Sequence, residues 1–541
     1  MKFKFILSLM MGAGAMTAFA QGGYQDGIDY YNADRFEDAQ EILNNTLNDA
    51  GTNKALSYFY LGSIELREGK TDAAKALFDK GVAADATCGY NYIGLGQIAL
   101  KGGDKKAAEN YFKQGLNTNK KDPKLMAAIA RAYYNVDPVA YKKQFDEYIK
   151  KAMKESKNLE SAVYVLLGDT VTNDPGEAAG KYEQAIEYDN QKGIINPEAY
   201  VKYANVYIRT NPTFAIQKLV DLNELLPTSA LAQRELAEKY YDNNQLTLAA
   251  QQYGKYMQNP NHFQRDEQRY SGLLYFAGDY PKSLEVAKGV LAKDPQNPYM
   301  WRMVMLNEAG LKNYPAAIEA GKKLFATPNT ELTFNDWSTY GDALAASEQY
   351  EEALKAYENA IKLRPEKVDV YTRMSTVYNN LKNYAKAAEY QQMYIDNEKE
   401  PSLTDIYMLG NRYKNLSISL PEGSAERVAA AETGITYVNK AIASAADESK
   451  PSMLRNLATL YVLRDNGVKD DAAQTYEQML KFYDQDPANK TKNVGAYKAA
   501  YQSLGNYYLD KGDKETARKY FELMLEVDPE NAALRDYLKN L

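Results

Sequence analysis

The sequence predicts an all-α solenoid of tandem helix–turn–helix units, and three observations support this fold class. A pattern of large and small residues recurs along the chain at an interval of about 34 residues. Only 18 Pro occur among 541 residues, so long helices are easily accommodated. Hydrophobic residues make up 45% of the chain, near the globular average, which argues against disorder. A repeat array also accommodates the length, because each unit buries surface only against its neighbours.

The recurring pattern is clearest near Gly341 and in the last repeat. Around Gly341 the chain places Trp337, Tyr340, Gly341 and Leu344, followed by Ala353, Tyr357, Ala360 and Pro365. The last repeat has Tyr501, Leu504, Gly505 and Tyr508, followed by Ala517, Phe521, Met524 and Pro529. These positions resemble the tetratricopeptide repeat, a helix–turn–helix unit. The resemblance implies a right-handed superhelical solenoid whose first helices line a concave surface.

Each position in the repeat has a physical reason. Gly341 lacks a side chain where the second helix of its unit comes closest, and Ala353 is the matching small residue on that helix. Tyr357 and Ala360 are expected to face the next repeat. Pro365 cannot continue the second helix and therefore ends it.

The repeat pattern predicts about 14 units. Their first-helix positions are Gly27, Gly62, Gly96, Ala130, Gly168, Ala204, Ala237, Ser271, Met305, Gly341, Ser375, Gly410, Ala458 and Gly505. We expect an N-terminal and central array over residues 21–415, an irregular repeat with an insertion over 416–452, and C-terminal repeats with a capping helix over 453–541. The capping helix is predicted from an apolar stripe, Leu534, Tyr537, Leu538 and Leu541, because a solenoid needs a covered end.

Residues 1–20 have the features of a bacterial signal peptide. Lys2 and Lys4 precede the apolar run from Phe5 to Met11, and small residues end in Ala18-Phe19-Ala20, which resembles a cleavage site. No Cys follows the small residues, so the segment does not resemble a lipoprotein signal. The sequence therefore predicts an exported protein, most simply periplasmic, with outer-membrane association or secretion as alternatives.

The composition excludes several kinds of chemistry. The only histidine is His262, so neither a two-histidine metal site nor several Ser-His-Asp combinations can be built. The only cysteine, Cys88, excludes disulfides within the chain and thiolate metal clusters. We expect no cofactor, no metal and no catalytic residue, although an enzyme that uses carboxylates alone stays open. A pI of about 5.3 argues against a nucleic-acid partner.

Two clusters of polar residues are candidates for contact with a partner. The resemblance implies that residues flanking the small position face the concave surface. The candidate residues are Lys202, Asn205, Arg209, Arg234 and Tyr241 in one cluster, and Arg373, Thr376, Asn379, Asn380, Tyr407, Asn411 and Lys414 in the other. Each cluster could hydrogen-bond a peptide backbone or an acidic segment. The bland alternative is that they are solvated polar residues on a helix face.

The leading hypothesis is a non-catalytic scaffold of the bacterial cell envelope that binds segments of other proteins. Some tetratricopeptide domains clamp a C-terminal carboxylate with a Lys and an Asn. Here Asn205 and Asn411 keep the Asn, but Val201 and Tyr407 replace the Lys. The resemblance therefore does not extend to that clamp. The alternative hypothesis is a glycan or small-ligand binding protein, against which the chain offers only 2 Trp and no separate ligand-binding part.

Overall fold

The computed structural model describes residues 23–541, which form thirty helices and no strand. The predicted signal peptide, residues 1–20, lies outside the described residues. The chain divides into two compact units, one extending to Val290 and the other beginning at Leu291. The repeat pattern runs through this boundary without interruption, so the sequence predicts no division there.

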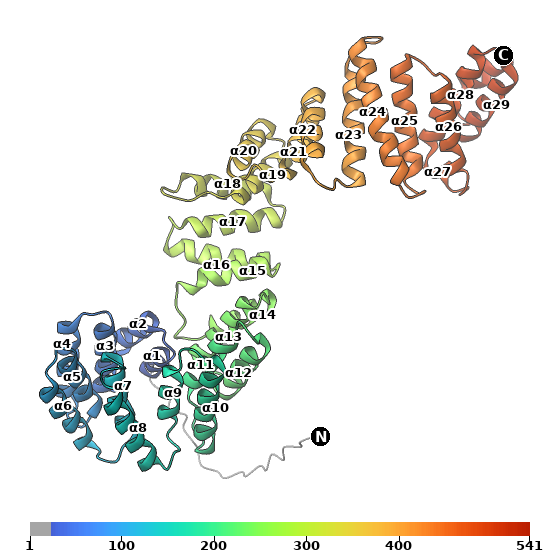
Figure 1. Ribbon diagram of the computed structural model, residues 1–541. Coiled ribbons are helices and arrows are strands. Elements are labelled where there is room, and N and C mark those ends of the chain that lie inside the picture. Colours follow the sequence, from blue (N-terminus) through green and yellow to red (C-terminus); the bar gives the residue numbers. More distant parts are fainter. Residues whose placement is uncertain (1–22) are drawn as a thin grey trace, which may run out of the picture. The chain divides into compact units, whose positions relative to one another are not determined.

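The first unit contains α1 to α15 and most of α16 (Figure 1). Its helices are α1 (Tyr24–Asn32), α2 (Phe36–Thr46), α3 (Lys54–Arg67), α4 (Thr71–Ala84), α5 (Gly89–Lys101), α6 (Lys105–Thr118), α7 (Pro123–Val136), α8 (Lys142–Ser156), α9 (Ser161–Thr170), α10 (Pro175–Gln191), α11 (Pro197–Tyr207), α12 (Pro212–Leu225), α13 (Ala230–Asp242), α14 (Leu246–Tyr256), α15 (Asp266–Phe276) and α16 (Tyr280–Lys293).

The second unit continues the same pattern of paired helices. It contains α17 (Pro298–Gly310), α18 (Tyr314–Ala326), α19 (Phe334–Ala346), α20 (Tyr350–Leu363), α21 (Asp369–Asn380), α22 (Tyr384–Asn397), α23 (Leu403–Ser419), α24 (Ala425–Ser444), α25 (Lys450–Asp465), α26 (Asp470–Tyr483), α27 (Asn489–Lys492), α28 (Val494–Asp510), α29 (Lys514–Val527) and α30 (Ala532–Asn540). All the first-helix positions predicted from the sequence lie within helices of the two units.

Close packing within a helix pair explains the small residues of the repeat. A Cβ atom added at Gly341 would lie 2.6 Å from the ring of Tyr357, and one added at Gly505 would lie 2.5 Å from the ring of Phe521. These distances are too short for non-bonded atoms, so only glycine allows the second helix to approach. The contact between Tyr357 and the glycine of its own repeat was not part of the sequence expectation, which had this ring facing the next repeat. Ala353 is fully buried, as the pattern requires.

The turns between paired helices use left-handed residues. Gly69 ends α3 at φ 82°, and the Lys70 amide then donates to the Glu65 carbonyl over 2.9 Å, which ends the helix in a tight turn. In other repeats non-glycine residues hold the same conformation, including Lys312 at φ 61° and Glu348 at φ 58°. L-residues adopt this region at a cost, so these turns are mildly strained.

The predicted insertion is absorbed mainly by longer helices. Residues 416–419 extend α23, and α24 begins at Ala425, so only 420–424 connect the two. The segment between α26 and α28 contains the short helix α27. The apolar stripe from Leu534 to Leu541 lies on and just after α30: Leu538 is buried, and the Tyr537 ring packs edge-on against Phe521 with centroids 5.7 Å apart.

Candidate functional site

A central cavity of about 850 Å³ lies inside the first unit. Its wall is formed mainly by residues of the first helices of successive repeats, α1, α3, α5, α7 and α11, and by the chain segments that lead into α9 and α11. Lining residues extend from Gln25 to Lys202, so the cavity depends on about the first third of the chain. The volume falls within the range of pockets that hold small ligands or short peptide segments.

Aromatic rings form one part of the cavity wall. The Tyr31 ring centroid lies 4.9 Å from that of Tyr60 and 5.3 Å from that of Phe36, both in edge-to-face geometry. Phe59 continues the group, at 5.1 Å from Tyr60 and 5.2 Å from Tyr90. Such contacts stabilise the rings against one another in the wall of the cavity.

Ion pairs across the repeats form another part of this region. Asp169 on α9 accepts from Arg131 on α7 and from Lys202 on α11, each over 2.8 Å. Lys202 Nζ also lies 3.2 Å from an Asp34 carboxylate oxygen and 3.6 Å from one of Glu198. Burial raises the pKa of the Asp169 carboxyl, but Arg131 and Lys202 outweigh it and hold that pKa below its usual range.

Asp29 differs from these carboxylates because no cation lies within ion-pair distance of it in the described structure. Its only hydrogen bond to another side chain comes from Gln25 Nε2, over 2.9 Å. Burial raises the pKa of the Asp29 carboxyl to about 7; the Gln25 hydrogen bond lowers it, and the charges of Asp26 and Glu198 raise it further. Asp29 lines the cavity and is half-buried.

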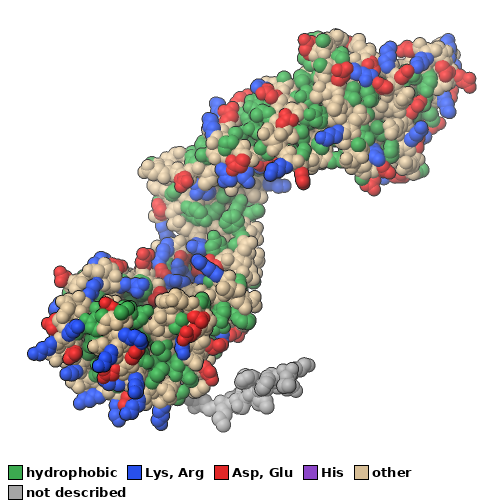
Figure 2. All heavy atoms as spheres, in the orientation of Figure 1, with side chains coloured by type: hydrophobic (Ala, Val, Ile, Leu, Met, Phe, Trp, Pro, Cys, Tyr) green, Lys and Arg blue, Asp and Glu red, His purple; other side chains and the backbone are tan. Residues whose placement is uncertain are grey.

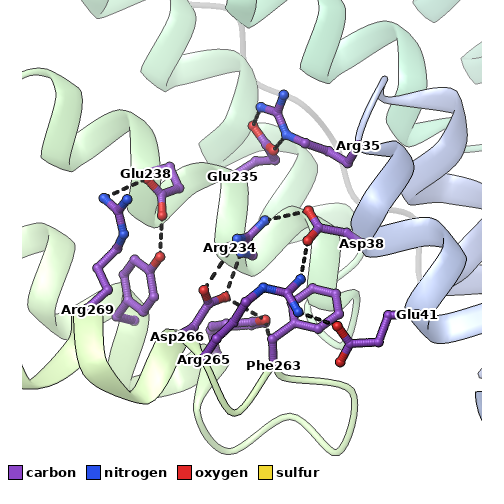
Figure 3. Close-up of polar contacts among 12 residues, drawn as sticks. Arg35, Asp38, Glu41, Arg234, Glu235, Glu238, Phe263, Arg265, Asp266 and Arg269 are labelled. Carbon is purple, nitrogen blue, oxygen red and sulfur yellow. Dashed lines mark hydrogen bonds and ion pairs between the residues drawn. The ribbon is translucent and has the colours of Figure 1, made fainter. Parts of the chain in front are cut away.

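The array of the first unit closes on itself, because α1 contacts α11 and α13 (Figure 1). Figure 3 shows the ion pairs that join α2 to α13 and α15. Arg234 Nη1 donates to Asp38 over 2.9 Å, and Arg234 Nε donates to Asp266 over 2.7 Å. Arg265 donates to both Asp38 and Glu41. We call these five residues the closure ion pairs.

Further contacts support the same closure. Arg35 donates to Glu235 through Nε over 2.6 Å and through Nη2 over 2.9 Å, and the Glu235 side chain is only 1% exposed. The guanidinium of Arg265 lies 3.9 Å from the Phe263 ring centroid, and Tyr30 packs edge-on against the same ring at 5.5 Å. Residues about 200 apart in sequence are therefore joined by buried charges and by apolar packing.

The first predicted cluster is divided between the closure and the surface. Lys202 is buried among the ion pairs described above, and Arg234 is one of the closure ion pairs. Asn205 and Arg209 are exposed, and Tyr241 is also exposed, with the Arg269 guanidinium 5.2 Å from its ring centroid. The structure therefore does not bring these five side chains together as one surface.

The second predicted cluster lies on one face of the second unit. Arg373 pairs with Asp342 over 2.7 Å and with Asp369 over 2.9 Å. Thr376 and Asn379 accept hydrogen bonds from residues of α23, whereas Asn380 is exposed. Tyr407 and Lys414 both contact Asn456 on α25, and the side-chain oxygen of Asn411 is buried without a hydrogen-bond partner among residues 23–541. We call this set, together with Arg412, Asn415 and Asn456, the polar face of α21, α23 and α25.

Two cations on this polar face have no carboxylate partner within residues 23–541. Arg412 donates to the hydroxyls of Ser375 over 3.0 Å and Thr376 over 3.2 Å, and Lys414 donates to the Asn456 amide oxygen over 2.6 Å. Burial lowers the pKa of Arg412, and burial followed by repulsion from Arg455 lowers the pKa of Lys414. A half-buried positive charge without a counter-ion favours the approach of an anion.

The described residues provide neither a metal cluster nor a membrane span. Between residues 23 and 541 no group of three or more His, Cys, Asp or Glu side chains is arranged to hold a metal ion. No helix in this range is long and apolar enough to cross a bilayer. Burial raises the pKa of the half-buried Cys88 thiol, which favours its unreactive protonated form.

Comparison with known proteins identifies the repeats. Models of the tetratricopeptide repeat match residues 15–87, 90–122 and 499–531, and a model of the TPR repeat matches residues 341–382. The chain is a tetratricopeptide-repeat protein. Repeats of this family generally mediate protein–protein interactions, and the family is typically non-catalytic. No curated protein sequence matches the chain.

Several solved structures are similar to the chain. The C-terminal part of a TPR repeat-containing protein from Cytophaga hutchinsonii is 19% identical, with a TM-score of 0.41 over 50% of this chain and 98% of that one. A tetratricopeptide repeat protein from Parabacteroides merdae is 14% identical, with a TM-score of 0.34 over 49% and 98% of the two chains. The APC/C hetero-tetramer Cut9-Hcn1 is 16% identical, with a TM-score of 0.28 over 95% of each.

Sequence reasoning missed the residues that shape the first unit of this tetratricopeptide-repeat protein. Asp38 and Glu41 lie near the start of α2, where acidic residues are common in any helix. No spacing rule links them to residues about 200 positions away. Asp29 lies two positions after Gly27, on the predicted first helix, but its isolation from cations is a property of the closed array. Arg412 was missed because the family pattern did not place it on the binding surface.

Proposed function

We propose that this tetratricopeptide-repeat protein is an exported, non-catalytic scaffold of the bacterial cell envelope that binds acidic segments of partner proteins. The polar face of α21, α23 and α25 is the proposed contact surface. Arg412 and Lys414 carry this proposal, because both cations are half-buried and lack a carboxylate partner in the described structure. An acidic side chain or a C-terminal carboxylate would supply the missing counter-charge.

Neighbouring groups of the polar face support the same ligand. Asn380 on this face is exposed, so its amide is accessible to a peptide backbone. Asn379 and Asn415 are hydrogen-bonded to each other over 3.0 Å on the same face. A peptide bound here would therefore meet both cations and amide groups, which suits an extended acidic segment. Elsewhere on the visible surface of the second unit acidic and basic side chains are interspersed (Figure 2), so large-scale charge gives no comparable selection there.

Export is supported by the order of features in positions 1–20, where positively charged residues come first, an apolar run follows, and small residues come last. A tagged full chain expressed in its own cells should lose this segment. Mass spectrometry of the purified protein identifies its N-terminal residue and so tests whether the segment has been removed. Cleavage after Ala20 and recovery from the periplasmic fraction are the expected results. An intact N-terminus in the cytoplasmic fraction would contradict export.

Crosslinking in living cells tests the partner. The full chain with a C-terminal tag is compared with Arg412→Gln/Lys414→Gln and with a control, Lys481→Gln/Lys519→Gln, which removes two exposed cations of the same unit. A small set of envelope proteins should be captured by the wild type and the control, and the polar-face variant should capture at least about tenfold less. Equal capture by all three proteins would remove this face as the contact surface.

A further inference from the structure

Two neighbouring second helices of the first unit, α6 and α8, carry lysines at matching positions. The buried positions of the two helices match at one constant offset: Ala108, Phe112 and Gly115 in α6, and Phe145, Ile149 and Ala152 in α8. At the same offset, Lys106 and Lys113 in α6 correspond to Lys143 and Lys150 in α8. The two lysines of each helix lie about two turns apart on the side opposite its buried positions, and all four are exposed. We call this side of α6 and α8, defined by the four lysines, the basic face.

The second helices on either side do not continue this pattern. Counted from their own buried positions, the equivalent residues are Asp72 and Asp79 in α4 and Gly176 and Glu183 in α10. Residues 101–157, which include α6 and α8, contain 13 Lys and 1 Arg against 7 Asp and Glu, whereas the whole chain has a net charge of −7. Figure 2 shows basic side chains along the margin of the first unit where Figure 1 places α6 and α8. The positive charge is therefore concentrated on one part of a protein that is acidic overall.

Neighbouring carboxylates neutralise little of this charge. Every lysine between positions 101 and 157 is exposed. Among the described residues only two of these lysines form ion pairs, Lys142 with Asp146 over 2.8 Å and Lys151 with Glu147 over 2.7 Å. The four lysines of the basic face form no ion pair within residues 23–541, so an anionic partner would meet charges that are not already engaged.

The place of the basic face in the array favours a broad partner over a segment held in a groove. The wall of the central cavity is formed mainly by first helices, so α6 and α8 lie on the outside of the array. Peptide segments are usually held in grooves, in pockets or at sheet edges, where contacts surround them. Lysines that project outward from two adjacent helices instead match an extended surface of negative charge, because each flexible side chain reaches its own anion.

The turn that leads into α8 places an apolar group beside the basic face. Pro138, Val139 and Ala140 are all exposed, and Val139 is 84% exposed. The Lys105 ammonium, at the start of α6, lies 5.5 Å from the Tyr141 ring centroid, so this turn adjoins α6 as well. Lysines beside apolar side chains are typical of surfaces that bind an anionic bilayer, where the lysines pair with phosphates and the apolar groups enter the headgroup region. An acidic protein would account for the lysines but not for the exposed apolar turn.

We propose that the basic face binds the surface of an anionic phospholipid bilayer, with its four lysines against the headgroup phosphates and Val139 within the headgroup region. Each lysine close to such a surface strengthens binding by up to about fivefold. This attraction falls off within about 10 Å at about 0.1 M salt, so it acts only when the face lies against the bilayer. The basic face belongs to the first unit and the polar face of α21, α23 and α25 to the second, so the membrane contact uses none of the residues proposed to bind partner proteins.

Sedimentation with vesicles tests the contact on the purified full chain. The probe is vesicles of about 30% phosphatidylglycerol in phosphatidylcholine, compared with vesicles of phosphatidylcholine alone, at about 0.1 M salt. The wild type should bind the anionic vesicles at least about tenfold more tightly, and raising the salt to about 0.5 M should remove most of this difference. Equal binding to both kinds of vesicle, or no binding to the anionic vesicles, would overturn the proposal.

The residue assignment is tested with two variants of equal net charge. Replacing the four lysines of the basic face by glutamine should weaken binding to the anionic vesicles at least about tenfold. The control replaces four exposed lysines of the second unit and should bind as the wild type does. The two variants are Lys106→Gln/Lys113→Gln/Lys143→Gln/Lys150→Gln and Lys355→Gln/Lys367→Gln/Lys481→Gln/Lys519→Gln. Equal affinities of the two variants would refute the assignment and would also be the result if residues 1–20, present in every protein compared, were the part that binds.

Two further measurements test the orientation and the class of partner. Val139→Trp should shift tryptophan emission to shorter wavelength on anionic vesicles, because an indole ring favours the headgroup region, whereas Leu248→Trp at an exposed position of α14 should not. Unchanged emission in Val139→Trp would contradict the proposed orientation. Polyglutamate stands in for an acidic protein and should leave the protein on the vesicles. Release of the protein by polyglutamate at an equal concentration of negative charges would replace the bilayer by an acidic protein as the partner of this face.

Discussion

Replacing Asp38 by alanine is expected to release α1 and α2 from α13 and α15 while the other repeats stay folded. The side chains of Asp38 and Arg234 are 12% and 15% exposed, so their ion pair is largely buried. Removing one partner of a buried pair costs about 3–5 kcal/mol when the other is left alone. Arg234 keeps Asp266, and the more exposed Arg265 keeps Glu41, so we expect a smaller loss of about 2 kcal/mol in the free energy of local opening.

Hydrogen–deuterium exchange measured by mass spectrometry is the suitable assay, because it reports local opening of each helix. A loss of about 2 kcal/mol corresponds to about thirtyfold faster exchange in peptides from α1 and α2. The control is Asp79→Ala, which breaks an exposed pair with Lys75 in the same unit and should change exchange less than about twofold. Exchange in α1 and α2 that rises less than about threefold in Asp38→Ala would refute the argument that these ion pairs hold the array closed.

Three further predictions concern packing, turn strain and pH. Ala353→Arg should destabilise the second unit by at least about 4 kcal/mol in urea unfolding, because Ala353 is fully buried. Glu352→Arg, at the exposed neighbouring position, should change stability by less than about 0.5 kcal/mol. Equal stabilities of the two variants would contradict the helix register. Glu348→Gly should stabilise the protein by about 0.5–1 kcal/mol, because Glu348 has φ 58°, a left-handed conformation that glycine adopts without strain. Glu352→Gly, within α20, should instead destabilise the protein by about 1 kcal/mol. A loss of stability in Glu348→Gly would refute the turn strain. The pKa of Asp29 is raised from 3.8 to about 7, so the folded state binds the Asp29 proton more tightly than the unfolded state, and wild-type stability falls as pH rises from about 4 to 7. Asp29→Asn has no such group, so its stability in thermal melts should increase relative to the wild type over this range, by at most about 4 kcal/mol. A constant difference in stability between pH 5 and pH 8 would contradict the raised pKa.

Local packing could be predicted from the sequence because each repeat is determined mainly by its own residues. Gly341 and Ala353 indicated where two helices approach, and the distance from Gly341 to the Tyr357 ring gives the reason. The turn at Lys312 was harder to predict, since the left-handed conformation is held there by a residue other than glycine. The lengthening of α23 and α24 was also not predicted, because the segment Leu416 to Arg427 contains Pro421 and Gly423 and resembles a loop.

The candidate sites could be predicted only where they depend on a single repeat or its neighbour. The position of Lys414 follows from the repeat register, and the structure adds the finding that no carboxylate in the described part of the chain pairs with it. The roles of Lys202 and Arg234 could not be predicted, because their partners Asp34 and Asp38 come from the first repeat. Contacts over such separations depend on the accumulated rotation from one repeat to the next, which no single repeat specifies.

The closure of the first unit has a consequence for the order in which the protein folds. An open array of repeats has almost only local contacts, so folding can begin anywhere and spread to neighbours. Here Asp38 meets Arg234 and Arg265 only after 196 and 227 further residues, respectively, have been made. The first helices to leave the ribosome are therefore among the last to reach their final stability, and the entropy lost in closing this long loop should slow that step. During this interval the N-terminal repeats would remain partly open.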